Sequence, residues 1–425
     1  MLKAVEPRVR IYHNIMWARY KGAIFSKIFM LHGFFKLNVA FIHVAETSDN
    51  RMVFGPPDYS YHAYPHELLF NGSYDRIPRY RLAIALVRDI LRNKSELVVI
   101  PGYDRIEHWA MLWACMAIGR KRAVFCDSTA KDNVKTRFKE IAKSFFFHHC
   151  HGIFCYGTRS KEYVQSYGID PRLIYSPCQA AALRHDYDAT AILARYRACA
   201  QRDGESPTFL FVGRMAKEKG LDDLLGAFRR IHEYLPKAKL LLAGPESERD
   251  RLRNQAMALG LEESIGYRGN QTPEQIGELL ETCTVMVLPS RREPWGLVVN
   301  EALSYGCPVV VSDICGCTPE LVLNGVTGYV FPAGDVGAQC ESMLQAIALN
   351  HNRLNTAKRC LEVISQYTPE RAALEILKGC NQILKGNSHH QIRIESGSPD
   401  LSNSVHCTAP ASAESKAQSS ECRRS

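Results

Sequence analysis

The sequence predicts an α/β protein made of two Rossmann-like, doubly wound parallel-sheet domains that face each other across a cleft. Three observations lead to this fold class. Short apolar runs alternate with helical patterns in the first half of the chain, the β-type runs stop at about Gln179, and the alternation restarts at Thr208. A chain of 425 residues is long enough for two domains, each with its own core. We therefore expect domains at 1–185 and 208–385, a linker or hinge at 186–207, and a disordered, Ser-rich tail at 386–425.

The first domain is expected to form a parallel sheet from short β-type runs, because helical stretches separate them. The predicted strands are Val9–Tyr12, Val39–Val44, Leu97–Ile100, Ala123–Cys126 and Ile153–Tyr156. The helical patterns between them are Ala23–Phe35, Tyr80–Arg92, Glu107–Ile118 and Asn133–Phe147.

The second domain repeats this alternation after the helix-like piece Ala189–Ala200 and a polar turn. Its predicted strands are Thr208–Val212, Lys239–Ala243, Ser264–Tyr267, Val285–Leu288, Val309–Ser312 and Gly328–Phe331. Three helical segments, which end near Leu384, are expected to close the folded part of the chain.

The positive charge of the chain is concentrated in the first domain. Residues 1–185 hold 27 Lys and Arg against 15 Asp and Glu (+12), the remainder holds 26 against 29 (−3), and the two sum to +9. This asymmetry indicates an anionic partner for the first domain. No nucleic-acid motif is present, so an anionic membrane surface or a phosphate-bearing acceptor fits at least as well.

One predicted helix combines basic and apolar side chains. Its basic residues are Lys131, Lys135, Arg137, Lys139 and Lys143, and Val134, Phe138, Ile141 and Phe145 lie between them. Such a helix either docks on an anionic bilayer or is an ordinary surface helix with its apolar side turned inward.

The composition favours a cytoplasmic protein. The alternative is a protein that binds peripherally to the inner face of the membrane. There is no apolar run of the roughly 18–20 residues that a transmembrane helix needs, and the N-terminus lacks the pattern of a secretory signal. The fifteen cysteines show no CxxC pair, which indicates a reducing compartment.

The second domain opens with a turn suited to phosphate. The strand Phe209–Val212 is followed by Gly213, Arg214, Lys217, Lys219 and Gly220, and then by a helix. Glycine lets the backbone approach a ligand, the helix N-terminus is electropositive, and the cations neutralise phosphate oxygens. Taken alone, the turn is as easily a solvated basic loop.

Two carboxylates lie at the same predicted edge of the sheet. The segment PSRREPWGLVVNEALSYG follows the strand Val285–Leu288 and carries Glu293 in a loop and Glu301 inside the next helix. Because ligands of open α/β sheets bind at the carboxyl ends of the strands, Glu293 and Gly296 should face the same crevice as the phosphate turn, with Glu301 further along the helix. Carboxylates beside a phosphate site accept hydrogen bonds from hydroxyls, so the pattern indicates a nucleotide-sugar.

At this point residues 208–335 resemble the donor half of retaining glycosyltransferases of family four (glycosyl transferases group 1), which adopt the GT-B fold. The resemblance rests on VGRMAKEKG, LLLAGPE, VMVLPSRREPWGLVVNEALSYGCPVV and GVTGYVFPAGD. It implies that Arg214 and Lys219, near Gly213, bind the diphosphate of the donor and that Glu293 serves as a catalytic residue at the donor sugar. It further implies that Glu301 binds the ribose, that the amides of Gly296 and Leu297 lie near the phosphates, and that the base lies against the segment of Tyr267.

The resemblance also implies transfer with retention at the anomeric carbon and no metal or other cofactor. The first half matches the family only loosely. Many relatives carry a Gly-Gly loop after the first strand, whereas here the segment is NIMWARYKGAIF, with Lys21 and the single Gly22. Where many have a histidine, this chain has Asp127, which either meets a sugar as a catalytic residue or caps the following helix. Tyr103 and Asp104, which follow another strand, either shape the acceptor site or only turn the chain.

The function expected from these features is transfer of a sugar from a nucleotide-diphosphate sugar to a carbohydrate or to a polyprenyl- or otherwise lipid-linked acceptor. Synthesis of a surface polysaccharide, an exopolysaccharide or a glycolipid would suit a basic acceptor domain beside a membrane. A GT-B-fold epimerase or hydrolase that acts on the nucleotide-sugar is one alternative. A degenerate transferase kept as a non-catalytic binding protein is another.

Overall fold

A computed structural model describes residues 8–131, 136–198 and 206–386, and the predicted tail lies outside them. The first domain is built on a seven-stranded parallel sheet with the strand order β3-β2-β1-β4-β5-β6-β7. The strands are β1 (Arg8–Ile15), β2 (Asn38–Thr47), β3 (His66–Ser73), β4 (Leu97–Ile100), β5 (Lys121–Cys126), β6 (Gly152–Cys155) and β7 (Ile174–Tyr175). All five predicted strands are confirmed, and the structure adds β3 and β7, which were not predicted.

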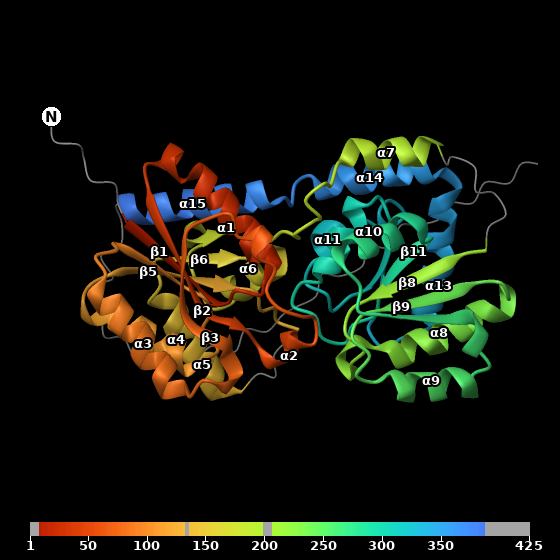
Figure 1. The fold of residues 1–425 in the computed structure, drawn as a ribbon, viewed down its shortest axis with the longest axis horizontal. Coiled ribbons are helices and arrows are strands. Elements are labelled where there is room, and N and C mark those ends of the chain that lie inside the picture. Colours follow the sequence, from red (N-terminus) through yellow and green to blue (C-terminus); the bar gives the residue numbers. More distant parts are fainter. Residues whose placement is uncertain (1–7, 132–135, 199–205, 387–425) are drawn as a thin grey trace, which may run out of the picture. The chain divides into compact units, whose positions relative to one another are not determined.

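Helices cover both faces of this sheet, because successive strand residues point to opposite sides. Val98 and Ile100 of β4 pack toward α3 (Arg79–Arg92), α4 (Ile106–Ala117), α5 (Arg137–His148) and α6 (Thr158–Gln165). Leu97 and Val99 pack toward α1 (Arg19–Leu31) and α15 (Pro369–Lys385). Figure 1 shows α3, α4 and α5 side by side on one face and α15 beside α1 on the other.

The helix α15 was assigned by chain order to the second domain, but it packs against the first. Its apolar residues Ala372, Ile376 and Cys380 belong to the same buried cluster as Phe25 of α1. The chain therefore returns to the first sheet after completing the second. Spacing along the sequence does not reveal such a return, because it depends on which apolar face the helix meets.

The second domain has a six-stranded parallel sheet with the order β10-β9-β8-β11-β12-β13. Its strands are β8 (Thr208–Val212), β9 (Lys239–Ala243), β10 (Ile265–Gly269), β11 (Val285–Leu288), β12 (Val309–Ser312) and β13 (Gly328–Phe331). Five of the six have the predicted bounds, and β10 differs by one or two residues at its ends. The doubly wound order places a topological switch point between β8 and β11, where ligands of such sheets bind.

Helices also flank the second sheet, around one large apolar core. They are α7 (Ala189–Ala198), α8 (Leu221–Tyr234), α9 (Arg249–Ala258), α10 (Pro273–Thr282), α11 (Leu297–Ser304), α12 (Thr318–Leu321), α13 (Val336–Ala348) and α14 (Arg353–Ile364). The short helix α2 (Asp49–Met52) belongs to the first domain. Among the described helices, none combines the length and apolarity required to cross a bilayer.

Candidate active site

The site begins at the switch point of the second sheet, where β8 and β11 are paired neighbours. Phe209 of β8 pairs with Val285 of β11, so the loops that follow both strands leave the same edge of the sheet. Gly213 follows β8 and donates its N–H to the carbonyl of Ala243. A Cβ on Gly244 would come within 2.0 Å of the Gly213 oxygen, so glycine is needed where these two chain segments cross.

A second glycine joins the two loops of the site. The 3-10 turn η5 (Lys217–Lys219) ends at Gly220, which has a left-handed φ of 67°. A Cβ on Gly220 would lie 2.1 Å from the carbonyl oxygen of Pro289, in the loop after β11. The N–H of Arg291 donates to the carbonyl of Glu218 at 2.8 Å, which ties the loops together. Lys219 is thereby held beside the segment that carries Glu293.

The centre of the site is an ion pair between two residues that lie 74 positions apart in the chain. Lys219 Nζ lies 2.5 Å from Glu293 Oε2, and the side chains are 15% and 16% exposed. Arg214 Nη2 lies 2.8 Å from Glu218 Oε1. Each predicted phosphate-binding cation is therefore already paired with a carboxylate, which fixes its position before any ligand arrives.

Arg51 of α2 adds a third cation near this centre. Burial lowers the pKa of its guanidinium, Arg214 acts in the same direction, and Tyr20 and Glu293 oppose the shift. The guanidinium also lies over the ring of Trp17, 5.1 Å from its centroid. The first domain thus contributes a positive charge close to Arg214 and Glu293.

The N-terminus of α11 faces the same loops. Gly296 is the N-cap and has a φ of 99°, which only glycine adopts readily. Leu297 is the first helical residue, and the first amides of a helix have no partner within it. They carry part of the positive end of the helix dipole, so a phosphate near Gly296 would be stabilised there.

Glu301, one turn further along α11, faces a cavity of about 250 Å³. Burial raises the pKa of Glu301 to about 7, and the charge of Arg19 opposes that shift. Within the described part of the chain its carboxylate has no hydrogen bond or ion pair with another side chain. A partly protonated carboxyl group without a partner is suited to accept a hydrogen bond from a ligand hydroxyl.

Several side chains around this cavity were not predicted from the sequence. Beside the predicted Leu297 and Glu301, the walls include Trp17, Arg19, Tyr20, Arg51 and Gln271. Trp17, Arg19 and Tyr20 lie in the segment NIMWARYKGAIF, whose departure from the usual Gly-Gly loop was a signal that bulky groups enter the site here. Arg51 and Gln271 carried no such signal.

Tyr267 lies in β10, outside the residues that line this cavity. Its hydroxyl is buried without a hydrogen-bond partner, and Arg249 lies over its ring at 5.6 Å. Burial raises the pKa of this phenol. Tyr267 thus packs against Arg249. Its contact with the nucleotide base of a donor remains a prediction.

On the side of the first domain, Asp127 and Lys21 influence one another electrostatically. Asp127 is exposed at the end of β5, and the next described helix, α5, has Thr136 as its N-cap, so Asp127 does not cap it. Lys21 is fully buried, with Nζ 4.1 Å from the ring centroid of Phe125. Burial lowers the pKa of Lys21 to about 8, while Cys178 and Asp127 oppose the shift.

The other predicted acceptor-side residues have structural contacts. A Cβ on Gly22 would lie 2.9 Å from the ring of His62, so this glycine allows α1 to pack closely. Tyr103 is buried against Phe147, with ring centroids 4.7 Å apart. Asp104 is exposed, 3.5 Å from His108 Nδ1. Tyr103 and Asp104 are not among the residues that line the cavity beside Glu301.

In the described part of the chain, no group of three or more His, Cys, Asp or Glu side chains could hold a metal ion. Twelve described cysteines are all buried, unpaired thiols. Arg51, Arg214 and Lys219 are the cations that lie near Glu293.

The second, Rossmann-like domain thus brings a cationic turn, a helix N-terminus and two carboxylates together around the switch point of its sheet. Residues 195–362 match the family model described as glycosyl transferases group 1. The predicted resemblance to this family is confirmed for the matched segment. Glycogen synthase from Mycobacterium tuberculosis is 33% identical over 187 residues, which are 43% of this chain and 44% of the relative. The match thus spans less than half the length of that curated relative.

Solved structures of low sequence identity share the fold over most of the chain. A glycosyltransferase from Rickettsia africae has a TM-score of 0.68 at 15% identity and covers 90% of this chain and 100% of its own. A protein from Anabaena in complex with UDP-glucose has a TM-score of 0.62 at 16% identity and covers 88% and 99%. The predicted GT-B fold is therefore confirmed.

Proposed function

We propose that the protein is a retaining glycosyltransferase that moves a sugar from a nucleoside-diphosphate sugar to a carbohydrate or lipid-linked acceptor. The observation that carries this proposal is the Lys219–Glu293 ion pair at the switch point. It sets a cation for the leaving phosphate next to a carboxylate for the sugar. The family match over residues 195–362 and the relatives' printed activities support the same reaction class.

The donor is expected to lie along the edge of the second sheet. Arg214, Lys219 and the first amides of α11 neutralise the diphosphate, with Gly213 allowing the backbone to approach. Glu293 accepts hydrogen bonds from hydroxyls of the sugar, and Glu301 accepts them from the ribose in the adjoining cavity. The Anabaena neighbour with bound UDP-glucose supports a nucleotide-sugar of this kind as donor.

The chemical step would break the bond between the anomeric carbon and the phosphate oxygen and form a bond to the acceptor hydroxyl on the same face of the sugar. The acceptor proton passes to an oxygen of the leaving diphosphate. The carboxylate of Glu293 is already held by Lys219, so we do not assign it the role of general base. Its role is to hold the sugar and to stabilise positive charge that develops at the anomeric centre.

The acceptor is expected to approach from the first domain, where Asp127 is exposed at a strand end and its charge acts on the buried Lys21. A polyprenyl- or lipid-linked acceptor would bring the enzyme to the inner face of a membrane. The excess of positive charge in residues 1–185 supports such a location. Synthesis of a polysaccharide or a glycolipid is the process that such an acceptor serves.

The test is stabilisation of the purified protein by a panel of UDP-, GDP- and ADP-sugars, followed by assays with candidate acceptors. A donor at one hundred times its dissociation constant should add about 2.7 kcal/mol to the free energy of unfolding. Transfer that requires an acceptor and retains the anomeric configuration supports the proposal. Consumption of the donor without acceptor would favour the epimerase or hydrolase alternative, and no stabilisation by any donor would overturn the assignment.

The reaction is further expected to need no metal ion, because protein cations can neutralise the diphosphate. Activity measured in excess EDTA should equal activity in added Mg²⁺ within about twofold. A loss of more than tenfold in EDTA that Mg²⁺ restores would contradict this expectation. Thermal unfolding of the protein in EDTA serves as the control for an indirect effect on the fold.

A further inference from the structure

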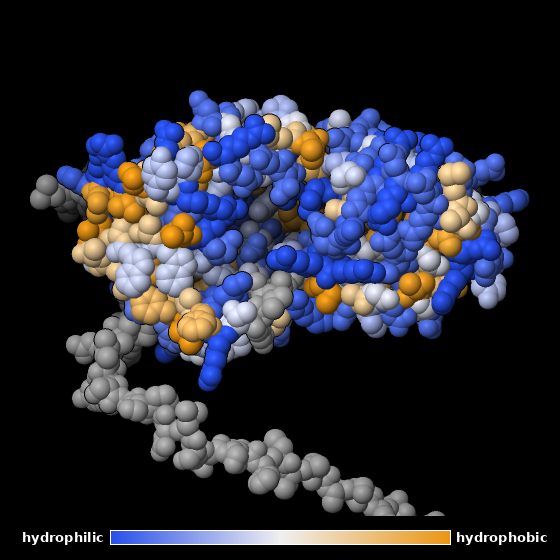
Figure 2. Space-filling model, turned by 90° about the horizontal axis from the view of Figure 1, so that it is seen from below, coloured by the Kyte–Doolittle hydropathy of each residue, from blue (hydrophilic) through white to orange (hydrophobic). Residues whose placement is uncertain are grey.

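Large apolar side chains are exposed on the helices that cover one face of the first sheet. Figure 2 shows such side chains gathered, with polar ones between them, on the side of the molecule that carries α3, α4 and α5. Those that belong to α3, α4 and α5 are Tyr80, Ile84, Leu91, Ile106, Trp113, Phe138 and Ile141, each at least 50% exposed. Isolated exposed apolar residues are common, but a cluster of this size marks an interaction surface.

The three helices form one continuous layer. The packing of α3 against α4 is among the most extensive between helices of this protein. Trp113 of α4 packs against Phe145 of α5, with ring centroids 5.3 Å apart. The apolar side chains of α3 and α5 therefore flank those of α4 on a common face, which we call the α3–α5 face.

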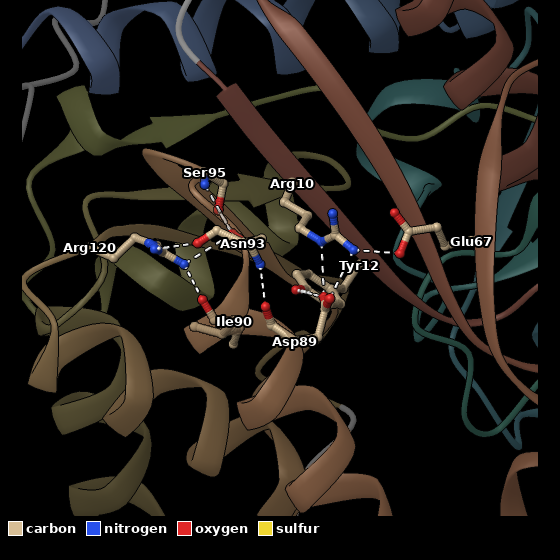
Figure 3. Close-up of polar contacts among 8 residues, drawn as sticks. All are labelled: Arg10, Tyr12, Glu67, Asp89, Ile90, Asn93, Ser95 and Arg120. Atoms are coloured by element: carbon tan, nitrogen blue, oxygen red, sulfur yellow. Dashed lines mark hydrogen bonds and ion pairs between the residues drawn. The ribbon is translucent and has the colours of Figure 1, made fainter.

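The outer side of α3 is positively charged because its acidic residue, Asp89, points toward the sheet. Arg81, Arg88 and Arg92 are exposed and have no ion pair among the described residues. The only acid of α3, Asp89, accepts two hydrogen bonds from Arg10, both at 2.9 Å, and one from Tyr12. Figure 3 shows Asp89 directed at Arg10 and Tyr12 of β1, while Glu67 of β3 contacts the same guanidinium.

The free carbonyl oxygens at the C-terminal end of α3 also have a partner within the protein. Arg120 donates to the carbonyl oxygens of Ile90 and Asn93 (Figure 3), so the negative end of the helix dipole is already satisfied. On the outer face, Ile84, Leu91, Arg88 and Arg92 line a shallow groove together with Ala83 and Val87.

On α5, part of the basic side chains predicted for docking is engaged elsewhere. Lys143 is paired with Glu140 at 3.0 Å, and Lys131, ahead of the helix, is paired with Asp313 at 2.7 Å. Lys135 lies outside the described residues. Arg137 and Lys139 are exposed, and Phe138 between them is 88% exposed. In an ordinary surface helix with its apolar side turned inward, Phe138 would instead be buried.

We propose that the α3–α5 face docks on an anionic lipid bilayer, with the arginines of α3 as its principal charged contacts. Apolar side chains enter the headgroup region while long arginine side chains reach the lipid phosphates. A nucleic acid would make no use of Ile84 and Leu91. A second copy of this chain would bring two arginine-rich faces together against their mutual repulsion. The inference deepens the membrane partner named under the proposed function.

The test uses sedimentation of the full-length protein with vesicles of phosphatidylcholine alone or with about 30% phosphatidylglycerol, without donor. Binding is expected to the anionic vesicles and to weaken as salt is raised. Since each basic residue near an anionic surface contributes about fivefold to binding, R88Q and R92Q together should weaken it by about tenfold or more. The pair I84N and L91N, which removes apolar contact, should weaken it as well.

The matched controls are K358Q and M257N, which change exposed residues of the same kinds in the second domain. They should leave vesicle binding within about twofold. No binding of the wild type, or equal binding by the α3 variants and the controls, would overturn the proposal. A dimer in solution that R88Q and R92Q alone abolish, with vesicle binding unchanged, would instead assign the face to a second copy.

Donor-induced stabilisation of the same variants keeps this proposal separate from the enzymatic one. The α3 variants should keep the stabilisation by a nucleotide-sugar and the unfolding temperature of the wild type, because all four residues are exposed. Loss of vesicle binding with intact donor binding supports the docking face alone. If the wild-type protein bound no donor, the proposed activity would be contradicted, but the evidence from vesicle binding would be unaffected.

Discussion

At the scale of single residues, the pairing of Lys219 with Glu293 explains how a carboxylate could lie beside the phosphate site that we propose. An unpaired carboxylate would repel the diphosphate, whereas one that is held by a lysine adds little net charge. The pair is largely shielded from solvent, so its geometry is defined more sharply than that of a surface pair. The residue types were predicted from the sequence, but their direct contact was not.

The first prediction tests this pair. Lys219→Ala and Glu293→Gln should each lower turnover by about 100-fold or more, since each removes a group that stabilises charge in the transition state. Lys217→Ala is the matched control, because Lys217 lies on the same turn, is exposed and has no described ion pair. Steady-state rates with the identified donor provide the measurement. Turnover near the wild-type value in Lys219→Ala would remove this lysine from the site.

The second prediction concerns Glu301, whose pKa burial raises to about 7. The ionised form accepts hydrogen bonds from hydroxyls, so nucleotide binding should tighten as pH rises from 6 to 8, by up to about tenfold. Glu301→Gln should make the dissociation constant nearly independent of pH in this range. Calorimetric titration with the nucleotide measures both profiles. Parallel pH profiles for the two proteins would contradict a role of Glu301 in binding.

Stability gives an independent check on the same residue. The pKa of Glu301 is higher in the folded than in the unfolded chain, so its contribution to stability is present at low pH and is lost as pH rises through 7. In the absence of ligand, Glu301→Gln should therefore unfold at a higher temperature than the wild type at pH 8 and at a similar temperature at pH 5.

At the scale of elements, the turn η5 depends on Gly220 to bring Lys219 to the loop after β11. The conformation at Gly220 is left-handed, and a Cβ there would lie 2.1 Å from the Pro289 oxygen. A helix start after a glycine is visible in the sequence. Its close approach to another loop is not, because the loops come together only through the pairing of β8 with β11.

The third prediction separates the two reasons for a glycine at position 220, its left-handed φ and its close approach to Pro289. Gly220→Ala should lower the free energy of unfolding by about 2 kcal/mol more than Gly260→Ala and should abolish donor-induced stabilisation. Gly260 is the matched control, since its φ of 68° is almost the same but a Cβ there would meet nothing within 4 Å. Urea unfolding with and without donor gives both quantities. Equal effects of the two substitutions would show that the contact with Pro289 is unimportant.

At the scale of the whole molecule, the first domain contains a cluster of buried imidazoles. Burial lowers the pKa of His13 to about 3, with Lys21 acting in the same direction. Burial likewise lowers the pKa of His43 to about 2 and that of His62 to about 4, and the neighbouring His66 adds to both shifts. These rings contact one another between β1, β2 and the segment before β3.

The fourth prediction follows from these shifts. Because the unfolded chain binds protons near pH 6.5 and the folded chain does not, stability is present above pH 6.5 and is lost as pH falls toward 4. Each imidazole contributes up to about 1.4 kcal/mol per pH unit. Unfolding temperature measured from pH 8 to 4 should fall steeply below 6.5, and His43→Gln should flatten the fall. The exposed His351→Gln should leave it unchanged, and a flat wild-type profile would contradict the prediction.

The local order of the chain could be predicted from the sequence because it depends on neighbours in the sequence. Most strands and the helix that follows Gly296 were found from apolar runs and glycines at short spacing, and the residues of the proposed donor site were chosen from charges in the same way. β3 was missed because its outward residues are polar, and β7 because it has only two residues. The family resemblance added roles for Arg214, Lys219, Glu293 and Glu301, whose effect on the reaction is now open to experiment.

The sequence by itself determined the doubly wound fold class, the motif that we propose as the donor site and the positive charge of the first domain. The tertiary structure alone decided that Lys219 meets Glu293, that Arg19 and Arg51 enter the cavity beside Glu301, and that α15 returns to the first sheet. It also decided that Asp89 turns inward and leaves the outer face of α3 to arginines. The physical reason is the same in each case. Periodicity and spacing report contacts between residues close in the chain, whereas these contacts join residues tens to hundreds of positions apart and exist only once the sheets are assembled.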